Sequence, residues 1–430
     1  MNKKKNRIAV VSGIRTPFAK GDGPLKNIQA DDLGALALKA LMNESDSNKN
    51  EIDEIIIGNV AQPANSANIA RVIALKAGFN KSIPAYTVHR NCASGMESIS
   101  SAAYKLLNGD ENKIIAGGTE SMSNIPFLFK PKMKKFFEEL FKAKTISQKL
   151  NCLRKFKLSN LMPIIGLVEG LTDPTCNLIM GLTAENIVNE FKISREEQDK
   201  YALESHQKAI KSRELLKEEI SPIPIMPDYK SILDQDHGPR EEQTLSALQK
   251  LKPYFNRQTG SVTVGNACPI SDGAAMLLLM TETEAKKEKK EVLGYINSFA
   301  YAGCEPRTMG LGPVFATQKL FKKTGFSIND MDLIEMNEAF AAQIIGNLRA
   351  FESKTFAKKH FDQSMAVGKI DEKKLNVNGG AIALGHPVGT SGTRLILTAL
   401  KELKRRGKER ALATLCVGGG QGAAFVVESN

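Results

Sequence analysis

The feature that most constrains the fold is an alternation of short apolar runs with helical patterns at both ends of the chain. In the first third, strands are predicted at 8–12, 54–57, 85–88 and 113–116, and helices at 31–42, 68–77 and 94–107. In the last third, strands are predicted at 292–301, 333–334, 375–377, 411–415 and 425–427, and helices at 314–323, 338–350 and 389–403. Strands that alternate with helices indicate an α/β layered domain with a largely parallel sheet.

An internal repeat links the two ends. Ser94-Gly95 opens a predicted helix that is followed by a strand ending in Gly117-Gly118. Ser391-Gly392 opens another, followed by a strand ending in Gly418-Gly419-Gly420. The order and spacing predict a duplicated α/β unit. The expected division is a first half at 1–120, an excursion at 121–265, a return to the first half at 266–290 and a second half at 291–430.

The middle of the chain has a different character, with more charge, more proline and irregular spacing. Helices are expected to open at Gly181 and after Ser194, where Glu197 completes a capping box. Three prolines, at 222, 224 and 227, predict a loop. The first helix of the chain is expected to use Asp31 or Asp32 as its N-cap. We expect the excursion to fold over the core.

The net charge of +12 is unevenly spread, because residues 130–157 carry ten Lys or Arg against two Glu. No nucleic-acid motif or aromatic stacking platform accompanies this charge, which argues against nucleic-acid binding. Apolar residues in the same segment fall on one helical face: Met133, Phe136, Phe137, Leu140 and Phe141. Three interpretations stay open for this face, namely packing on the core, lying on an anionic membrane surface, or docking on a partner subunit.

The remaining composition points to a globular protein without a membrane span. The longest apolar runs, such as 274–280, are far shorter than the ~20 residues a spanning helix needs. The start of the chain lacks the apolar core of a secretory signal. Six scattered cysteines without a CxxC pair predict reduced thiols rather than disulfides or a zinc site. A cytoplasmic protein is therefore expected.

Cys92 is the first candidate for chemistry. It follows a predicted buried strand at 85–88 and precedes a predicted helix. The free N–H groups and the positive dipole end of a helix N-terminus favour a negative sulfur, so a nucleophilic thiolate is expected there. A structural cysteine is the alternative.

Three further stretches combine polar residues with glycine. They are Asn337–Gln343, Asn378–Gly389 with its single histidine, and Cys416–Gly420. Glycine lets the backbone approach a ligand and point N–H groups at it. Ligands bind beyond the carboxyl ends of strands in open α/β sheets, and Cys92, Asn337, His386 and Cys416 all follow predicted strand ends.

These motifs, in this order, resemble those of the thiolases (acetyl-CoA acyltransferases) along nearly the whole chain. The matching stretches are Arg15-Thr16-Pro17-Phe18, Asn91–Gly95, Gly117–Ser123, Met180–Glu185, Asn337–Phe340, Gly385-His386-Pro387 and Cys416–Gly420. The resemblance implies two similar βαβαβαββ halves in α-β-α-β-α layers with a long inserted loop domain. It also implies an acyltransferase that uses coenzyme A as a substrate and needs no metal and no other cofactor.

The resemblance also assigns roles. Cys92 would carry the acyl group as a thioester, His386 would take the thiol proton, and Cys416 would act as acid and base at the second carbon. One oxyanion site would consist of His386 with a water held by Asn337. The other would use the backbone N–H groups of Cys92 and Gly418. Met180 and Phe340 would contact the substrate.

Several positions depart from the short-chain biosynthetic members of the family. Ile179 stands where they have histidine, and Ala267-Cys268-Pro269 stands where they have Ala-Ser-Gly. The greater length resembles the long β-subunit of the fatty-acid oxidation complex, although Asn337 stands where that type usually has histidine.

The expected function is cleavage of medium- to long-chain 3-ketoacyl-CoA in fatty-acid β-oxidation. The alternatives are synthesis of acetoacetyl-CoA and non-catalytic binding of acyl-CoA or lipid. The expected partners are further copies of the chain, in a homodimer or larger, and a hydratase/dehydrogenase α-subunit.

Overall fold

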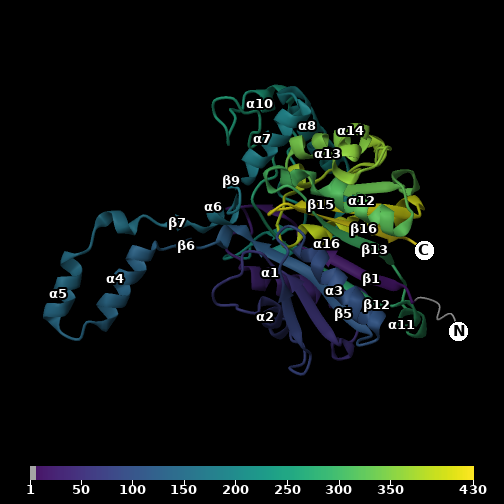
Figure 1. Cartoon of the computed structure of the whole chain (residues 1–430). Coiled ribbons are helices and arrows are strands. Elements are labelled where there is room, and N and C mark those ends of the chain that lie inside the picture. The colour runs from purple at the N-terminus through teal and green to yellow at the C-terminus, as the bar shows by residue number, and fades with distance from the viewer. Residues whose placement is uncertain (1–5) are drawn as a thin grey trace.

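The computed structural model describes residues 6–430, and within them the central feature is a mixed sheet of ten strands (Figure 1). The strand order is β14-β15-β16-β13-β1-β12-β5-β3-β4, with β2 (Ala19–Lys20) paired to β12. The strands of the first half are β1 (Ile8–Arg15), β3 (Glu54–Gly58), β4 (Ala85–Val88), β5 (Lys113–Ser121) and β12 (Ser271–Thr281). Those of the second half are β13 (Gly294–Gly303), β14 (Leu333–Met336), β15 (Arg410–Val417) and β16 (Gln421–Glu428).

The sheet is built from two similar halves that meet where β1 pairs with β13. The first half reads β4-β3-β5-β12-β1 and the second reads β14-β15-β16-β13 in the corresponding order. The position that matches β4 is occupied by Leu375, which forms a single parallel bridge to Ile334 of β14. The predicted duplication is therefore confirmed, whereas the predicted strand at 375–377 is reduced to one bridge.

Helices cover both faces of each half and fill the space between them. The helices concerned are α1 (Ala30–Ser45), α2 (Ile69–Lys76), α3 (Ser94–Asn108), α12 (Gly312–Thr324), α13 (Ala341–Glu352) and α16 (Ser391–Arg406). One buried cluster joins α1 and α2 to the first half, another joins α12 and α13 to the second, and a third joins α3 and α16 to both. This arrangement is the expected α-β-α-β-α layering.

The prediction of a largely parallel sheet is wrong. Among the strand pairs of the sheet within residues 6–430, only β3–β4, β3–β5 and β14–β15 are parallel, because β12 and β16 each return antiparallel beside β5 and β15. Strand β12 was not predicted, although it contains the apolar run 274–280. All eleven of its residues are buried. A strand buried on both faces has no alternating pattern by which to recognise it.

Several element boundaries also differ from the prediction. Helix α1 begins at Ala30 after Gln29, with no side-chain cap, so Asp31 and Asp32 lie inside its first turn. Strand β5 continues through Gly117 and Gly118 to Ser121. Strand β4 is only partly buried, since it lies at the edge of the sheet.

Helix α13 begins at Ala341 and not at Glu338. The Glu338 carboxylate is instead a buried anchor: it accepts hydrogen bonds from Tyr201 Oη at 2.9 Å, Ser205 Oγ at 2.6 Å and Asn376 Nδ2 at 2.8 Å. These contacts fix the loop before the helix to the excursion.

Most of the excursion packs on the body, as expected. The helices of this packed part are α6 (Gly166–Gly170), α7 (Met180–Phe191), α8 (Arg195–Lys211), α9 (Arg213–Lys217) and α10 (Leu245–Gln249), and the capping box at Ser194 and Glu197 is confirmed. The proline-rich loop forms only a two-residue pairing of β10 (Ile223–Pro224) with β11 (Ile232–Leu233). Outside the excursion there are also α11 (Glu282–Lys287), α14 (Lys354–Phe361) and α15 (Ala381–Leu384).

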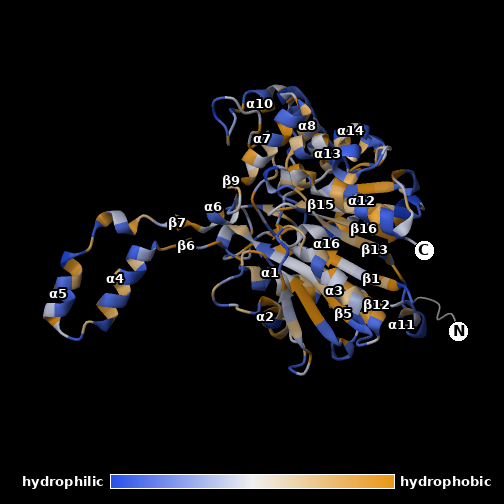
Figure 2. Cartoon of the chain, in the orientation of Figure 1, coloured by the Kyte–Doolittle hydropathy of each residue, from blue (hydrophilic) through white to orange (hydrophobic). Residues whose placement is uncertain are grey.

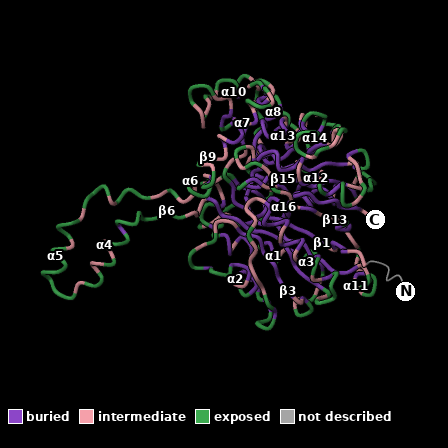
Figure 3. The backbone as a smooth tube through the Cα atoms, in the orientation of Figure 1, coloured by how far each residue is buried: buried purple, intermediate pink, exposed green. Residues whose placement is uncertain are grey.

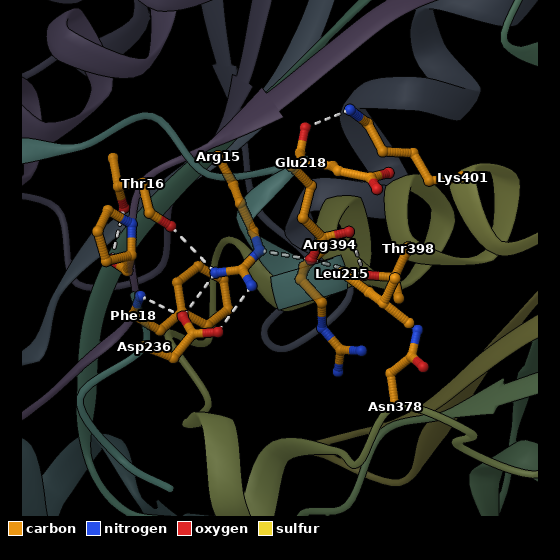
Figure 4. Close-up of polar contacts among 12 residues, drawn as sticks. Arg15, Thr16, Phe18, Leu215, Glu218, Asp236, Asn378, Arg394, Thr398 and Lys401 are labelled. Atoms are coloured by element: carbon orange, nitrogen blue, oxygen red, sulfur yellow. Dashed lines mark hydrogen bonds and ion pairs between the residues drawn. The ribbon is translucent and has the colours of Figure 1, made fainter. Parts of the chain in front are cut away.

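A buried ionic cluster ties the end of the excursion to β1 (Figure 4). The fully buried Arg15 guanidinium donates to both carboxylate oxygens of Asp236 at 2.6 and 2.7 Å, and to Glu219 at 2.7 Å. Glu219 also accepts from Thr398 of α16 at 3.0 Å. Removing one partner of such a pair leaves a buried charge uncompensated, which typically costs about 3–5 kcal/mol.

Residues 127–165, hereafter the arm, do not fold over the core. They leave the body as β6 (Phe127–Leu128), form α4 (Pro131–Lys142) and α5 (Ile146–Arg154), and return as β7 (Ile164–Ile165), which pairs with β6 (Figure 1). Almost the whole arm is exposed or partly exposed (Figure 3). The apolar face of α4 packs within the arm, with Phe136 and Phe156 at 5.0 Å between ring centroids. The interpretation that this face packs on the core is therefore wrong.

Within residues 6–430 no helix has both the length and the apolar character needed to cross a membrane.

Candidate active site

Cys92 lies on a tight turn between β4 and α3, two residues before the helix begins. Asn91 before it has a left-handed backbone with φ of 41°, which asparagine tolerates better than most residues. Ser94 closes the turn, since its Oγ donates to Asn91 O at 2.7 Å and accepts from Arg90 N at 2.9 Å. The Asn91 Nδ2 donates to Gly418 O at 2.7 Å, so the turn is held against the end of β15.

The electrostatics of Cys92 differ from the expectation of a ready thiolate. Burial raises the pKa of the Cys92 thiol to about 11, and this outweighs hydrogen bonding from the backbone N–H groups of Gly418 and Cys92 itself, which lowers it. The helix terminus therefore does not ionise the thiol at rest. These are the same two N–H groups that the resemblance assigns to one of the oxyanion sites.

His386 lies in the loop before α16, immediately after Gly385 with φ of 111°. Its backbone N–H donates to Ser271 Oγ at 3.1 Å, and its Nδ1 lies 2.6 Å from Ser391 Oγ. Burial lowers the pKa of the His386 imidazole to about 3, and the positive charge of Arg394 acts in the same direction. The ring is therefore neutral at physiological pH, and one of its nitrogens carries a lone pair that can accept a hydrogen bond or a proton.

Asn337 follows β14 and faces the other nitrogen of this ring. Its Nδ2 lies 3.4 Å from His386 Nε2, and its backbone N–H donates to Thr414 O at 3.0 Å. The Oδ1 atom is buried without a protein partner. A buried acceptor of this kind requires a bound water or a ligand group, since an unpaired one is costly.

Cys416 is the next-to-last residue of β15 and is 1% exposed. It packs in an apolar cluster with Phe340, and Met180 and Cys268 lie against the same cluster. Burial raises its pKa well above the usual range, and negative charge on Cys92, Cys268 or Cys304 would raise it further.

Met180 is the first residue of α7 and also adjoins the end of β15. A Cβ added at Gly418 would lie 3.7 Å from Met180 Sδ. The start of α3, which follows Cys92, also lies against the loop before α16, which contains His386. A Cβ at Gly95 would lie 3.0 Å from Gly389 O. Thus the loops that carry Cys92, His386 and Cys416 lie close together, with Met180 beside the last of them.

Two residues of the site were missed. Glu120 is fully buried and accepts from Ala61 N and Gly389 N, both at 2.9 Å, and from Val60 N at 3.0 Å. Burial raises its pKa to about 7, although these N–H groups lower it. Its place within the motif Gly117–Ser123 is the sequence feature that could have identified it. Ser391 was noted only as the start of a helix, and nothing in the sequence pairs it with His386.

Together these groups form a site suited to acyl transfer. A partly exposed thiol, a neutral imidazole, a second thiol and backbone N–H donors meet at the carboxyl ends of β4, β14 and β15. A thiol can hold an acyl group as a thioester, and N–H groups can stabilise a carbonyl oxygen that gains negative charge. On this duplicated fold, such a site defines an acyltransferase of the thiolase class.

The chain belongs to the thiolase family. The model of the thiolase N-terminal domain matches residues 8–283, and that of the thiolase C-terminal domain matches residues 290–429. The chain is 41% identical to a 3-ketoacyl-CoA thiolase of Pseudoalteromonas translucida, covering 99% of this chain and 98% of that protein. It is 40% identical to a 3-ketoacyl-CoA thiolase of Shewanella loihica with the same coverage.

Solved structures agree with this assignment. The acetyl-CoA acetyltransferase of Bacillus anthracis is 36% identical with a TM-score of 0.86, covering 99% of both chains. The human mitochondrial 3-ketoacyl-CoA thiolase in complex with CoA is 35% identical with a TM-score of 0.83, covering 99% of this chain and 98% of that one. The resemblance and the fold inferred from the sequence are confirmed.

Proposed function

We propose that the protein is a 3-ketoacyl-CoA thiolase that cleaves medium- to long-chain substrates to acetyl-CoA and an acyl-CoA shortened by two carbons. The observation that carries this proposal is that the loops of Cys92, His386 and Cys416 lie against one another: Asn91 Nδ2 donates to Gly418 O at 2.7 Å, and a Cβ at Gly95 would lie 3.0 Å from Gly389 O. The curated relatives named 3-ketoacyl-CoA thiolase support it over the full length.

The first half of the reaction makes the acyl-enzyme. Because the Cys92 thiol is un-ionised at rest, it must lose its proton to His386 Nε2 as the sulfur attacks the 3-keto carbon. The bond between the second and third carbons then breaks. The electron pair goes to the second carbon, which takes a proton from Cys416, and acetyl-CoA leaves.

The second half regenerates the enzyme. Coenzyme A attacks the Cys92 thioester and its thiol proton passes to the Cys416 thiolate. The departing Cys92 sulfur recovers its proton from the His386 imidazolium, and the shortened acyl-CoA leaves. All transferred protons are thereby returned without a metal or a redox cofactor.

Two sets of donors would stabilise the oxygens that gain negative charge. The N–H groups of Cys92 and Gly418 would hold the thioester oxygen, and protonated His386 with an Asn337-bound water would hold the enolate oxygen. The partnerless Oδ1 of Asn337 supports the water. Met180 and Phe340, beside Gly418 and Cys416, would contact the acyl portion.

Trapping tests the proposal. The protein is incubated with acyl-CoA and Cys92 is examined by mass spectrometry for an acyl adduct. No adduct on the native protein contradicts the enzyme and favours a non-catalytic acyl-CoA-binding protein. An adduct that persists on another thiol in Cys92→Ser contradicts the residue assignment.

Synthesis of acetoacetyl-CoA is the second candidate. Asn337 favours it, because the long β-subunit type usually has histidine at this position. The similarity to the acetyl-CoA acetyltransferase favours it too. Steady-state kinetics with C4 and with C10 to C16 ketoacyl-CoA separate the two. A kcat/KM that falls as the chain lengthens supports the synthetic enzyme.

We further propose the setting in which the enzyme works. It would act in the cytoplasm, as a homodimer or larger, with a hydratase/dehydrogenase α-subunit as partner and with peripheral membrane contact through 130–157. The six free thiols support the compartment, and the basic segment supports the contact.

A further inference from the structure

We propose that Asn91 is a positioning residue for the oxyanion site at Cys92, because it holds the two N–H donors of that site at a fixed separation. One donor is the N–H group of Cys92, which belongs to the peptide bond that Asn91 itself forms with Cys92. The other is the N–H group of Gly418, and Asn91 Nδ2 donates to the carbonyl oxygen of the same residue at 2.7 Å. This role rests on the proposed function, since it serves the same reaction.

The loop that carries Gly418 has little rigidity of its own. Gly418-Gly419-Gly420 joins β15 to β16, two apolar and largely buried strands whose ends, Val417 and Gln421, pair across the loop (Figure 2). Gly419 and Gly420 have φ of 86° and 77°, in the left-handed region that glycine enters without strain. Because three consecutive glycines offer no side chain to pack, the position of the Gly418 N–H group must be fixed by other contacts.

The two ends of this loop are held in different ways. At the far end, Cys304 N donates to Gly420 O at 2.7 Å, and a Cβ added at Gly420 would clash with the backbone of Cys304 and Pro306. At the near end, a Cβ added at Gly418 would meet nothing closer than 3.6 Å, so packing leaves this residue room to move. Among residues 6–430, Asn91 Nδ2 is the only donor to Gly418 O. This one hydrogen bond therefore sets where Gly418 lies relative to the Cys92 turn.

Asn91 is itself firmly held. Its carbonyl oxygen accepts from Ser94 N at 2.9 Å and from Ser94 Oγ at 2.7 Å, and these bonds fix the turn from which the amide projects. The neighbouring Arg90 contacts the opposite end of the glycine loop, where its Nη1 donates to Gln421 Oε1 at 3.3 Å. Two adjacent residues of the Cys92 turn thus hold the loop of the second half at both of its ends.

The separation of the two donors matters when the substrate carbonyl oxygen gains negative charge. Attack of the Cys92 sulfur on the 3-keto carbon moves the electron pair of the C=O bond onto oxygen, while the thiol proton passes to His386 Nε2. The pair returns as the bond between the second and third carbons breaks, and the second carbon takes a proton from Cys416. Both N–H groups lower the pKa of the Cys92 thiol by hydrogen bonding, so both lie beside the sulfur. Donors already in place around the oxygen stabilise its charge without reorganisation.

The alternative is that asparagine is required only for its backbone, since Asn91 has φ of 41°. Asn91→Gly separates the two, because glycine keeps this conformation and removes the amide. Asn91→Asp keeps the size but places a carboxylate, which cannot donate, opposite Gly418 O. Asn177→Gly is the matched control: Asn177 has φ of 55° and is exposed on the turn between β8 (Thr172–Asp173) and β9 (Leu178–Ile179).

Single-turnover kinetics measure the effect. The native protein and the variants are mixed with acetyl-CoA or decanoyl-CoA, and the acyl group on Cys92 is quantified by mass spectrometry after quenching. In Asn91→Gly the acylation rate at saturating acyl-CoA should fall about tenfold or more, and Asn91→Asp should lose more. The concentration that gives half of this rate should change by less than about threefold, because the lost stabilisation acts on charge that forms only in the transition state.

Alkylation of Cys92 by iodoacetamide is the second readout, and a general loss of structure would change it as well. No oxygen gains charge in this reaction, so Asn91→Gly should be alkylated within about threefold of the native rate. Asn177→Gly should match the native protein in both reactions. The role of Asn91 is overturned by native acylation in Asn91→Gly, by equal losses of acylation and alkylation, or by an equal loss of acylation in Asn177→Gly. A native protein that is alkylated but never acylated contradicts the proposed function itself, and the role of Asn91 with it.

Discussion

The two halves of the molecule place different residues at matching positions. Gly58 of β3 pairs with Gly118 of β5, and Met336 of β14 pairs with Thr414 of β15. An asparagine follows each of β3 and β14, namely Asn59 and Asn337. Two residues after Gly118 on β5 lies Glu120, and two residues after Thr414 on β15 lies Cys416. The loops before α3 and α16 carry Cys92 and His386. One half supplies a single reactive residue, and the other supplies three.

The comparison shows how duplication separated chemistry from support. In the first half, Asn59 Nδ2 donates to Glu120 at 3.1 Å, and Glu120 accepts from Gly389 N, three residues after His386. In return, Asn91 beside the nucleophile donates to Gly418 O, two residues after Cys416. Each half therefore holds a reactive loop of the other, and the site exists only where both are present.

The largest expected effect is at the one reactive residue of the first half. Cys92→Ala removes the atom that carries the acyl group, so kcat should fall by about four orders of magnitude or more. Stopped-flow kinetics with a ketoacyl-CoA substrate and mass spectrometry of the acyl adduct measure this. An acyl-enzyme in Cys92→Ala would place the nucleophile elsewhere.

Cys416→Ala should separate the two steps of the reaction. The variant should still acquire an acyl group on Cys92 from acyl-CoA, but carbon–carbon cleavage should fall by about a hundred- to ten-thousandfold because the acid is lost. Cys304→Ala is the control, since Cys304 is a partly buried thiol with no proposed role, whereas Cys416 is buried. Equal losses in both variants would argue that only packing had changed.

The resting protonation state gives a third prediction. With the pKa of Cys92 raised to about 11 and that of His386 lowered to about 3, the site at rest holds a thiol and a neutral imidazole. Alkylation of Cys92 by iodoacetamide should therefore rise about tenfold per pH unit, or about a thousandfold from pH 7 to 10. A rate that levels off near pH 6–7 would reveal a thiolate–imidazolium pair instead.

Asn337 and Asn59 offer a direct test of the division between the halves. Both are buried, and both have an Oδ1 without a protein partner. Asn337→Ala should lower kcat by about a hundred- to a thousandfold through loss of an oxyanion donor, with little change in Tm. Asn59→Ala should mainly lower Tm, because it removes hydrogen bonds to Glu120 and to Thr119 O at 2.9 Å. The reverse pattern would contradict the assignment.

Much of this arrangement could be predicted from the sequence, because motifs and helical periods are local. Cys92, Asn337, His386 and Cys416 follow short apolar runs, and the repeat of Ser-Gly and Gly-Gly pairs indicated the duplication. The Cys92 pKa could not be predicted, since burial depends on residues far away in the chain. Strand β12 was missed because it is buried on both faces, and the Ser391 contact depends on the geometry of one loop.

The smallest expected effect concerns the supporting carboxylate. Burial raises the pKa of Glu120 from 4.5 to about 7, so the folded protein holds this proton more tightly than the unfolded chain does. Folding stability from this group is therefore fully present below about pH 4.5 and is lost as the pH rises to about 7, by up to about 3 kcal/mol. Glu120→Gln cannot titrate, so its urea-unfolding free energy should change less between pH 5 and 8 than that of the native protein. Glu97→Gln serves as the control, because Glu97 lies on α3, is only partly buried and pairs with Arg90. If Glu120→Gln keeps the native pH slope, the four donors around Glu120 hold it ionised throughout, and the first half contributes a fixed negative charge beside the reactive loop of the second.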